Sequence, residues 1–242
     1  MYAIETQDLS KRYGSLTALD ALNLTVEDGE LFALLGVNGA GKTTTIKLLS
    51  CLMNPTNGTA KIYGYDILSS NHEARSLLAT SPQETAVAPN LSVRENLELM
   101  AGIYGASASN AKQKTAQSIE AFNMTSIQHT QAKKLSGGWQ RRLSIAMALI
   151  SEPKLLFLDE PTLGLDVLAR RELWSIIRSL KGKTTIILTT HYLEEAQALS
   201  DRIGILAKGK LVALGTAEEL MQQAGASNFE DAFIALAGGA VL

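Results

Sequence analysis

One stretch decides the fold of this chain: Gly36-Val37-Asn38-Gly39-Ala40-Gly41-Lys42-Thr43-Thr44. It follows an apolar run, residues 31–35, that is typical of a buried strand, and it precedes a segment with apolar residues at helical spacing. Glycines allow the backbone between strand and helix to curl with positive φ, so that consecutive N–H groups turn inward around an anion. The first N–H groups and the positive dipole end of the helix face the same anion. The stretch is therefore predicted to bind a phosphate group.

The residue types within this loop have separate tasks. Lys42 adds a positive charge for the β and γ phosphates, and the hydroxyl of Thr43 is placed to ligate Mg²⁺, as the pattern G-x-x-x-x-G-K-[ST] implies. The alternative is a glycine-rich turn without a ligand, but Ile46, Leu49 and Met53 fall on one helical face and favour the phosphate site. The predicted nucleotide-binding residues of the loop are Gly36, Asn38, Gly39, Ala40, Gly41, Lys42, Thr43 and Thr44.

The composition indicates a globular chain whose partners are small molecules or proteins. Of its 242 residues, 46% are hydrophobic, which suffices for one large domain or a two-lobed one. A formal net charge of −2, without long basic runs, argues against a nucleic-acid partner, which normally meets a concentrated basic face. The longest apolar run, residues 233–242, is shorter than the roughly 18 residues that a bilayer-spanning helix needs.

The cysteine content and the N-terminus predict a cytoplasmic protein. The single cysteine, Cys51, continues the apolar pattern of the helix after the loop, and we expect a packed thiol in a reducing compartment. The first residues, Met1 to Glu5, do not have the basic and then apolar order of a signal peptide.

Alternating patterns near the N-terminus predict an antiparallel sheet beside the phosphate-binding core. Leu22, Leu24 and Val26 alternate with polar residues, as expected of a half-buried strand, and residues 60–63 form a second alternating piece between two glycines. Tyr13 falls in a predicted loop between strands.

Helical periodicity replaces strand patterns between residues 90 and 151. Ser92 and Glu95 fit a capping box at the start of one helix. A later helix carries Leu143, Ala146 and Met147 on one face. We expect this region to form a separate helical subdomain.

Strands and helices alternate again after Pro153. The apolar runs 155–158 and 184–188 are separated by a helical pattern at 172–180, which predicts parallel β-α-β packing. Residues 203–206 and 211–214 are predicted to form a hairpin, and two short helices, near 217–223 and 230–237, complete the chain.

Two acidic residues follow the apolar run at 155–158. Asp159 and Glu160 would stand at the carboxyl end of a buried strand, where ligands of open α/β sheets collect. Asp159 is positioned to hold Mg²⁺, and Glu160 could orient or deprotonate an attacking water. A pair of solvated acids is the alternative for an isolated Asp-Glu, but a phosphate-binding loop in the same chain favours the catalytic interpretation.

A second anion-binding helix end is predicted at Ser136, Gly137 and Gly138. The serine hydroxyl, the exposed N–H groups and the helix dipole all favour an anion there. A simple N-cap would explain Ser136, but two adjacent glycines lower helix propensity without a gain in packing. Two such helix ends in one chain require an explanation.

Over essentially its whole length the chain resembles the ATP-binding subunit of ABC transporters. The motifs that carry the resemblance occur in the order and approximate spacing of that family. They are the loop at 36–43, Gln83 in Ser81-Pro82-Gln83-Glu84, Leu135-Ser136-Gly137-Gly138, Asp159-Glu160-Pro161, Gly164-Leu165-Asp166 and Thr190-His191.

The resemblance implies a fold and a domain organisation. The fold is α/β: a P-loop NTPase (RecA-like) core with an antiparallel β subdomain and an inserted α-helical subdomain. A single domain at 1–242 is expected, with the core and β subdomain at 1–89 and 152–242 and the helical subdomain at 90–151.

The resemblance also implies residue roles that the residues by themselves do not reveal. Tyr13 would stack on adenine, Gln83 would sense Mg²⁺ and the attacking water, Asp166 would contact a partner across a dimer, and His191 would hydrogen-bond the γ phosphate. Two copies would pair head to tail, as a homodimer, so that residues 136–138 of one cover the ATP·Mg²⁺ of the other. ATP and Mg²⁺ are thus the implied cofactors.

A membrane permease is the implied second partner, with the chain peripheral on the inner face of the cell membrane and no nucleic acid involved. Residues 79–83, 91–97 and 191–196 look most like bacterial exporters of the sodium, drug and lipid type. One alternative is an ABC-type ATPase that acts on DNA or ribosomes. A kinase or GTPase with a phosphate-binding loop is another, but it leaves the second anion-binding helix end unexplained.

Two residues depart from the usual family pattern. Trp139 stands where Gln or another flexible residue is common, and Leu163 where Ser is common. Trp139 would pack against the helical subdomain or contact the nucleotide or the partner subunit. Neither change removes a predicted phosphate or metal ligand, so we expect activity to persist.

Overall fold

A computed structural model describes the backbone of residues 1–241 and the side chains of residues 1–238. Leu242, the end of the expected core range, lies outside the described residues. The strands are β1 (Tyr2–Tyr13), β2 (Leu16–Leu22), β3 (Thr25–Glu27), β4 (Leu31–Leu35), β5 (Asn57–Ile62), β6 (Tyr65–Asp66), β7 (Leu78–Ser81), β8 (Leu155–Asp159), β9 (Thr185–Thr190), β10 (Arg202–Ala207) and β11 (Lys210–Gly215). The α-helices are α1 (Lys42–Leu49), α2 (Asn71–Ser76), α3 (Val93–Ile103), α4 (Ala108–Ala121), α5 (Gly137–Leu149), α6 (Val167–Leu180), α7 (Leu193–Leu199), α8 (Ala217–Ala224) and α9 (Phe229–Val241).

The central sheet has the order β11-β10-β4-β9-β8-β7 within the described range. Its strands are parallel except for β11, which forms the predicted hairpin with β10. Every residue of β4, β8 and β9 is buried, as parallel strands covered on both faces should be. Because the strands are parallel, their carboxyl ends meet at one edge, and the loops after β4, β8 and β9 converge there.

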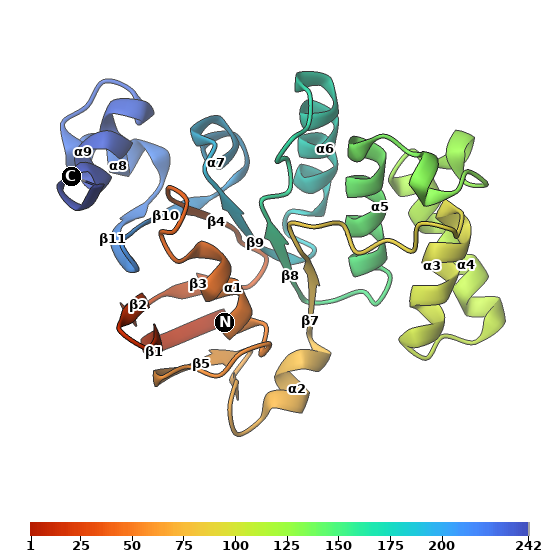
Figure 1. The fold of residues 1–242 in the computed structure, drawn as a ribbon, viewed down its shortest axis with the longest axis horizontal. Coiled ribbons are helices and arrows are strands. Elements are labelled where there is room, and N and C mark those ends of the chain that lie inside the picture. The colour runs from red at the N-terminus through yellow and green to blue at the C-terminus, as the bar shows by residue number, and fades with distance from the viewer. Residues whose placement is uncertain (242) are drawn as a thin grey trace.

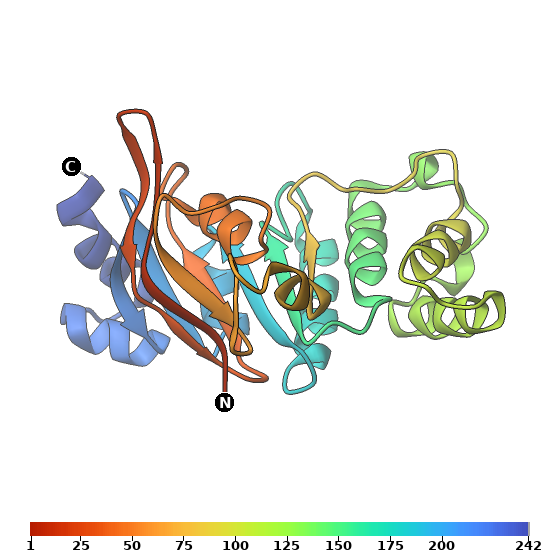
Figure 2. The same cartoon turned by 90° about the horizontal axis from the view of Figure 1, so that it is seen from below.

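The central sheet separates two apolar clusters. Leu31, Ala33 and Leu35 of β4 enter the larger cluster, whereas Phe32 and Leu34 enter the smaller one, as alternation along a strand requires. The smaller cluster holds α1 between the central sheet and the N-terminal sheet, an arrangement visible from below (Figure 2). The larger cluster holds α5, α6 and α7 against the other face.

The predicted antiparallel sheet is confirmed near the N-terminus. β1 pairs with β2, β3 and β5, and β5 pairs with β6. The prediction of one strand through Leu22, Leu24 and Val26 is wrong, since β2 ends at Leu22 and β3 begins at Thr25. Residues 23–24 separate the two strands: the N–H of Leu24 donates to the hydroxyl of Thr6 at 2.8 Å, and the Leu24 side chain stays buried. Tyr13, expected in a loop, is the last residue of β1.

Helices α3, α4 and α5 lie together at one end of the molecule, opposite α8 and α9 (Figure 1). The predicted capping box at Ser92 and Glu95 is confirmed at the start of α3. Helix α5 is buried on more than the single predicted face, because α6 and β7 contact it from the core while α3 contacts it from the other side. Together with the two sheets, these helices confirm the predicted fold class.

Cys51 packs against apolar residues as predicted, but it lies outside the helix. Helix α1 ends at Leu49, and Cys51 follows it with a left-handed φ of 57°. The thiol is half-buried against the smaller apolar cluster, and burial raises its pKa. Cys51 and Met53 therefore continue the apolar surface of α1 without continuing the helix.

Across residues 1–241, every helix falls short of the length and apolar character required to cross a membrane.

Candidate nucleotide-binding site

The loop between β4 and α1 has the backbone geometry of an anion nest. Gly39 and Gly41 have φ values of 82° and 107°, which side chains other than glycine rarely adopt. A Cβ atom at Gly41 would lie 2.6 Å from the carbonyl oxygen of Ala18, and one at Gly36 would lie 2.5 Å from that of Leu206. Glycine is therefore required both by conformation and by close backbone approach.

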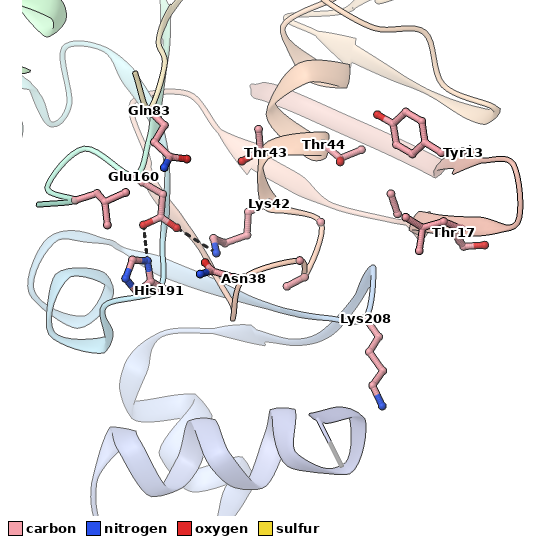
Figure 3. Close-up of a pocket in the computed structure, with 16 residues that line it drawn as sticks. Tyr13, Thr17, Asn38, Lys42, Thr43, Thr44, Gln83, Glu160, His191 and Lys208 are labelled. Atoms are coloured by element: carbon pink, nitrogen blue, oxygen red, sulfur yellow. Dashed lines mark hydrogen bonds and ion pairs between the residues drawn. The ribbon is translucent and has the colours of Figure 1, made fainter. Parts of the chain in front are cut away.

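A cavity of about 620 Å³ opens over this loop. Figure 3 shows Tyr13 at one end of it and Glu160 and His191 at the other, with Lys42 and Thr43 between them. Most of the predicted nucleotide-binding residues line it: Tyr13, Asn38, Gly39, Ala40, Gly41, Lys42, Thr43, Thr44, Gln83, Glu160 and His191. Leu16, Thr17, Ala18, Leu163 and Lys208 line it as well, so the departure at Leu163 faces the site.

Lys42 is held at the bottom of the cavity. Lys42 forms an ion pair with Glu160, in which Nζ lies 3.1 Å from Oε1, and only 6% of the Lys42 side chain is exposed. Nζ also donates to the carbonyl oxygen of Gly36 at 2.7 Å. The ammonium group is therefore fixed in position by the loop that carries it and by the acid across the cavity.

Glu160 connects Lys42 to His191. Its Oε2 lies 2.8 Å from His191 Nδ1, while its Oε1 contacts Lys42. Its backbone has a left-handed φ of 49°, and its N–H donates to the backbone oxygen and the hydroxyl of Thr189. A strained backbone that aims a carboxylate at two partners is a feature often found at catalytic sites.

Asp159 is the last residue of β8 and faces Thr43. The hydroxyl of Thr43 donates to Asp159 Oδ1 at 3.3 Å, and Thr189 donates to the same oxygen at 2.5 Å. A carboxylate and a hydroxyl this close are hard oxygen donors of the kind that Mg²⁺ prefers. The residues present therefore fit a Mg²⁺ ion.

Tyr13 and Gln83 approach the cavity from separate segments. The ring of Tyr13 is 44% exposed, and its hydroxyl donates to the sulfur of Met53 at 2.9 Å. Lys11 Nζ lies 5.4 Å from the centre of that ring. Gln83 follows β7 and is exposed, with its backbone carbonyl held by Arg141.

Four parts of the predicted site are outside the cavity lining in the described part of the chain: Gly36, Asp159, residues 136–138 and Asp166. Gly36 and Asp159 lie beneath the cavity, in contact with Lys42 and Thr43 respectively. Ser136 and Gly137 are exposed at the start of α5. Asp166 is exposed and caps α6, where its Oδ1 accepts from the N–H groups of Leu168 and Ala169.

Trp139 packs within its own subunit. Its half-buried side chain contacts the larger apolar cluster, and the guanidinium carbon of Arg142 lies 4.4 Å from the ring centre. Arg142 in turn forms an ion pair with Glu172 of α6. These contacts favour the packing role over a direct contact with the nucleotide.

Sequence patterns missed three residues near the site. The Thr189 hydroxyl donates to Asp159 and accepts from the N–H of Glu160. The signal that could have found it is a pair of polar residues at the end of a buried strand. Arg141 and Glu195 are buried charged residues within helical patterns, where their contacts come from distant segments. For Arg141, burial lowers the pKa of the guanidinium, and Asp159 and Glu195 oppose that shift.

The buried carboxyl group of Glu195 should make the free energy of unfolding depend on pH. Burial raises the pKa of its carboxyl group, while the hydrogen bond that the indole of Trp174 donates to Oε1 at 3.0 Å opposes the shift. The neutral acid therefore stabilises the fold fully below the ordinary pKa of 4.5, and this contribution is lost as pH rises through the raised folded pKa.

We expect Glu195→Gln to raise the melting temperature at pH 8, because the amide stays neutral and still accepts from Trp174. Each kcal/mol corresponds to a shift of about 2–4 °C in a chain of this size, and the difference should vanish below pH 4.5. Thermal unfolding from pH 4 to pH 8 measures it. The exposed neighbour Glu194→Gln serves as the control, and a destabilised Glu195→Gln at pH 8 would mean that the buried carboxylate is ionised and paired.

Comparison with known proteins identifies the family. The model of the family described as "ABC transporter" matches residues 19–163. The chain is 41% identical over 226 residues to the daunorubicin/doxorubicin resistance ATP-binding protein DrrA of Streptomyces peucetius, covering 93% of this chain and 68% of DrrA. It is 41% identical over 239 residues to the probable multidrug ABC transporter ATP-binding protein YbhF of Escherichia coli (strain K12), covering 96% of this chain. The alignment spans only 41% of YbhF.

A solved structure agrees with these relatives. A chain described as the ATP binding subunit of an ABC transporter superimposes with a TM-score of 0.85 at 32% identity, covering 97% of this chain and 99% of that one. Subunits of this family bind ATP and hydrolyse it to power transport, and they dimerise and associate with membrane permeases. The phosphate-binding loop, the acids at the end of β8 and the matching fold thus lead to one conclusion: this chain belongs to the ABC transporter family, as an ATP-binding subunit.

Proposed function

We propose that this chain is the ATP-hydrolysing subunit of an exporter, in which two copies pair head to tail around two ATP·Mg²⁺. The observation that carries the proposal is the cluster of Lys42, Glu160 and His191, joined at 3.1 Å and 2.8 Å in the cavity over the phosphate-binding loop. We also propose that the chain is one domain, with residues 90–151 as its helical subdomain.

In the proposed reaction, Lys42 and the N–H groups of the loop bind the β and γ phosphates. Phosphate oxygens compete with Glu160 for Lys42, so ATP binding frees Oε1 to accept a proton from the attacking water. His191 holds the other carboxylate oxygen and donates to the γ phosphate, while Tyr13 stacks on the adenine. When bound, Mg²⁺ neutralises charge on the phosphate oxygens, and Thr43, Asp159 and Gln83 would hold it.

The dimer accounts for the exposed helix end at residues 136–138. In the described chain these residues lie outside the cavity lining, so an anion held by Ser136 and Gly138 would belong to another subunit. An exposed helix N-terminus with two glycines offers N–H groups to a phosphate. Asp166, at the exposed start of α6, would contact the partner. A γ phosphate that bridges two subunits makes closure depend on ATP and lets hydrolysis release it.

A mixing experiment tests the head-to-tail arrangement. Lys42→Ala disables the loop of each subunit, and Ser136→Arg fills the helix end, so each variant alone is expected to be inactive. In a mixed dimer, the Ser136→Arg subunit supplies an intact phosphate-binding loop and the Lys42→Ala subunit supplies an intact helix end, so one of the two sites is complete. Equal mixing should restore about a quarter of wild-type ATPase activity, because random pairing makes half of the dimers mixed and each has one complete site of two.

The matched control replaces the Lys42→Ala partner with a subunit that carries both substitutions, which leaves every mixed dimer without a complete site. Recovery in the first mixture and none in the control supports the arrangement. Inactivity of both mixtures, with dimers present, would contradict it.

The export role rests on the relatives, whose names describe drug resistance and multidrug transport. We propose that the chain lies on the cytoplasmic face of the membrane and that the permease supplies the contacts to the transported compound. Mild detergent extraction should co-purify the chain with a membrane-spanning protein. Co-sedimentation with ribosomes or DNA instead would favour a role outside transport.

A further inference from the structure

A buried arginine of α5 binds the backbone of two functional loops at once. Arg141 is 4% exposed. Its Nη1 donates to the carbonyl oxygen of Pro82 at 2.5 Å, and its Nη2 donates to the carbonyl oxygen of Gln83. The same Nη2 reaches the carbonyl oxygen of Glu160 at 3.4 Å. One side chain thus connects α5 to the loop after β7 and to the loop after β8.

The position of Arg141 within α5 allows a movement at the start of this helix to reach the Gln83 and Glu160 loops. Arg141 lies one helical turn after Gly138. Gly138 belongs to the N-terminal end of α5, which is proposed to bind the partner's γ phosphate. One further turn along, the hydroxyl of Ser144 lies 3.1 Å from that of Ser81, so α5 contacts the end of β7 at two points. A displacement of the start of α5 would therefore be transmitted to the backbone of Gln83 and Glu160.

Arginine is suited to this task for a geometric reason. Its planar guanidinium presents several N–H donors in a fixed fork, whereas a lysine ammonium is a point charge that reorients freely. The guanidinium can therefore hold carbonyl oxygens from separate segments at fixed positions relative to one another. Carbonyl groups that lose a buried donor are left unpaired, which favours movement of their loops.

We propose that Arg141 is the positioning residue that couples the anion-binding end of α5 to Gln83 and Glu160 within one subunit. Engagement of α5 by the second subunit's ATP would then place the water-handling groups of the first site. The proposal rests on the proposed head-to-tail function, and it makes each site depend on the state of the other.

The neighbouring Arg142 offers a matched control. It is on the same helix, 5% exposed, and its partners are the Trp139 ring and Glu172 of α6, away from the Gln83 and Glu160 loops. We expect Arg141→Lys to lower kcat by about 10- to 100-fold, the range expected when catalytic groups shift by about an ångström. The KM for ATP should change by less than about threefold, because Lys42 and the loop are untouched. Arg142→Lys should keep kcat within about twofold, as for a substitution away from the reacting groups.

Hydrogen exchange provides a readout that does not need turnover. With ATP bound to the non-hydrolysing Glu160→Gln form, the amides of Gln83 and Glu84 and those at the start of α5 should become protected together. Adding Arg141→Lys should leave the start of α5 protected while exchange at the amides of Gln83 and Glu84 stays fast. Arg142→Lys should preserve protection at both segments.

The outcomes separate this proposal from the proposed function. Equal kcat for both lysine variants, or joint protection that survives Arg141→Lys, overturns the coupling. An inactive wild-type chain would contradict the proposed function, and the exchange measurement would still decide the role of Arg141. Arg141→Gln, which keeps two N–H donors without the fork, replaces Arg141→Lys if that variant does not fold, with the same expectations.

Discussion

Glu160→Gln is expected to stop ATP turnover while ATP binding persists, so that ATP-bound subunits accumulate as a dimer. The amide has the shape of the acid and can still accept from Lys42, but it cannot take a proton from water. General bases typically contribute about 10²- to 10⁴-fold to a rate, and we expect a loss of turnover in that range. Because hydrolysis is the event that would release the γ phosphate from both subunits, its loss should trap the closed dimer.

Phosphate release and size-exclusion chromatography with and without ATP measure the two effects together. Glu152→Gln is a suitable control, since Glu152 is exposed in the loop between α5 and β8, where it pairs with Lys114. That variant should hydrolyse ATP normally and remain free to dissociate. Normal turnover in Glu160→Gln would assign the proton acceptor to another group.

Lys42→Ala is expected to weaken ATP binding itself. Hydrogen bonds to charged groups contribute about 1.5–3 kcal/mol, which corresponds to an increase in Kd of roughly 10- to 150-fold. Loss of Lys42 also removes the partner 3.1 Å from Glu160, so that an uncompensated carboxylate faces the γ phosphate. Both effects act in the same direction, and turnover should fall with binding.

Nucleotide titration by calorimetry measures this affinity directly. Lys47→Ala makes the same substitution on the exposed side of the same helix and should bind ATP as tightly as the wild type. If Lys42→Ala bound ATP with unchanged Kd but failed to hydrolyse it, Lys42 would act on the transition state alone. The contrast between Lys42→Ala and Glu160→Gln therefore separates binding from chemistry.

The parts of the fold that depend on local patterns could be predicted from sequence. Residues 31–35 are apolar throughout because both faces of β4 are covered, and the glycines after them signal the turn into α1. The capping box at Ser92 and Glu95 follows from two residues three apart. Each of these features depends on residues close together in the sequence, so a local pattern is enough to predict it.

Other features depended on contacts that no local pattern records. β2 and β3 are separate strands because the pairing is interrupted at residues 23–24, where the N–H of Leu24 donates to the hydroxyl of Thr6. The alternation of Leu22, Leu24 and Val26 continues across that break. Cys51 keeps the apolar periodicity of α1 after the helix has ended. Periodicity reports which side chains are buried, and it cannot tell whether the backbone between them stays regular.

The chemical groups of this protein can be identified from the amino-acid order alone: a glycine-rich stretch with Lys42 and Thr43, and two acids at the end of a buried strand. Tertiary structure decided which of these groups meet. Lys42, Glu160 and His191 follow three different strands, β4, β8 and β9, and they converge because parallel strands bring their carboxyl ends to one edge. The contact of Arg141 with Pro82 and Gln83 likewise exists only once α5 packs against β7, because the physical link is a side chain that crosses between segments distant in the chain.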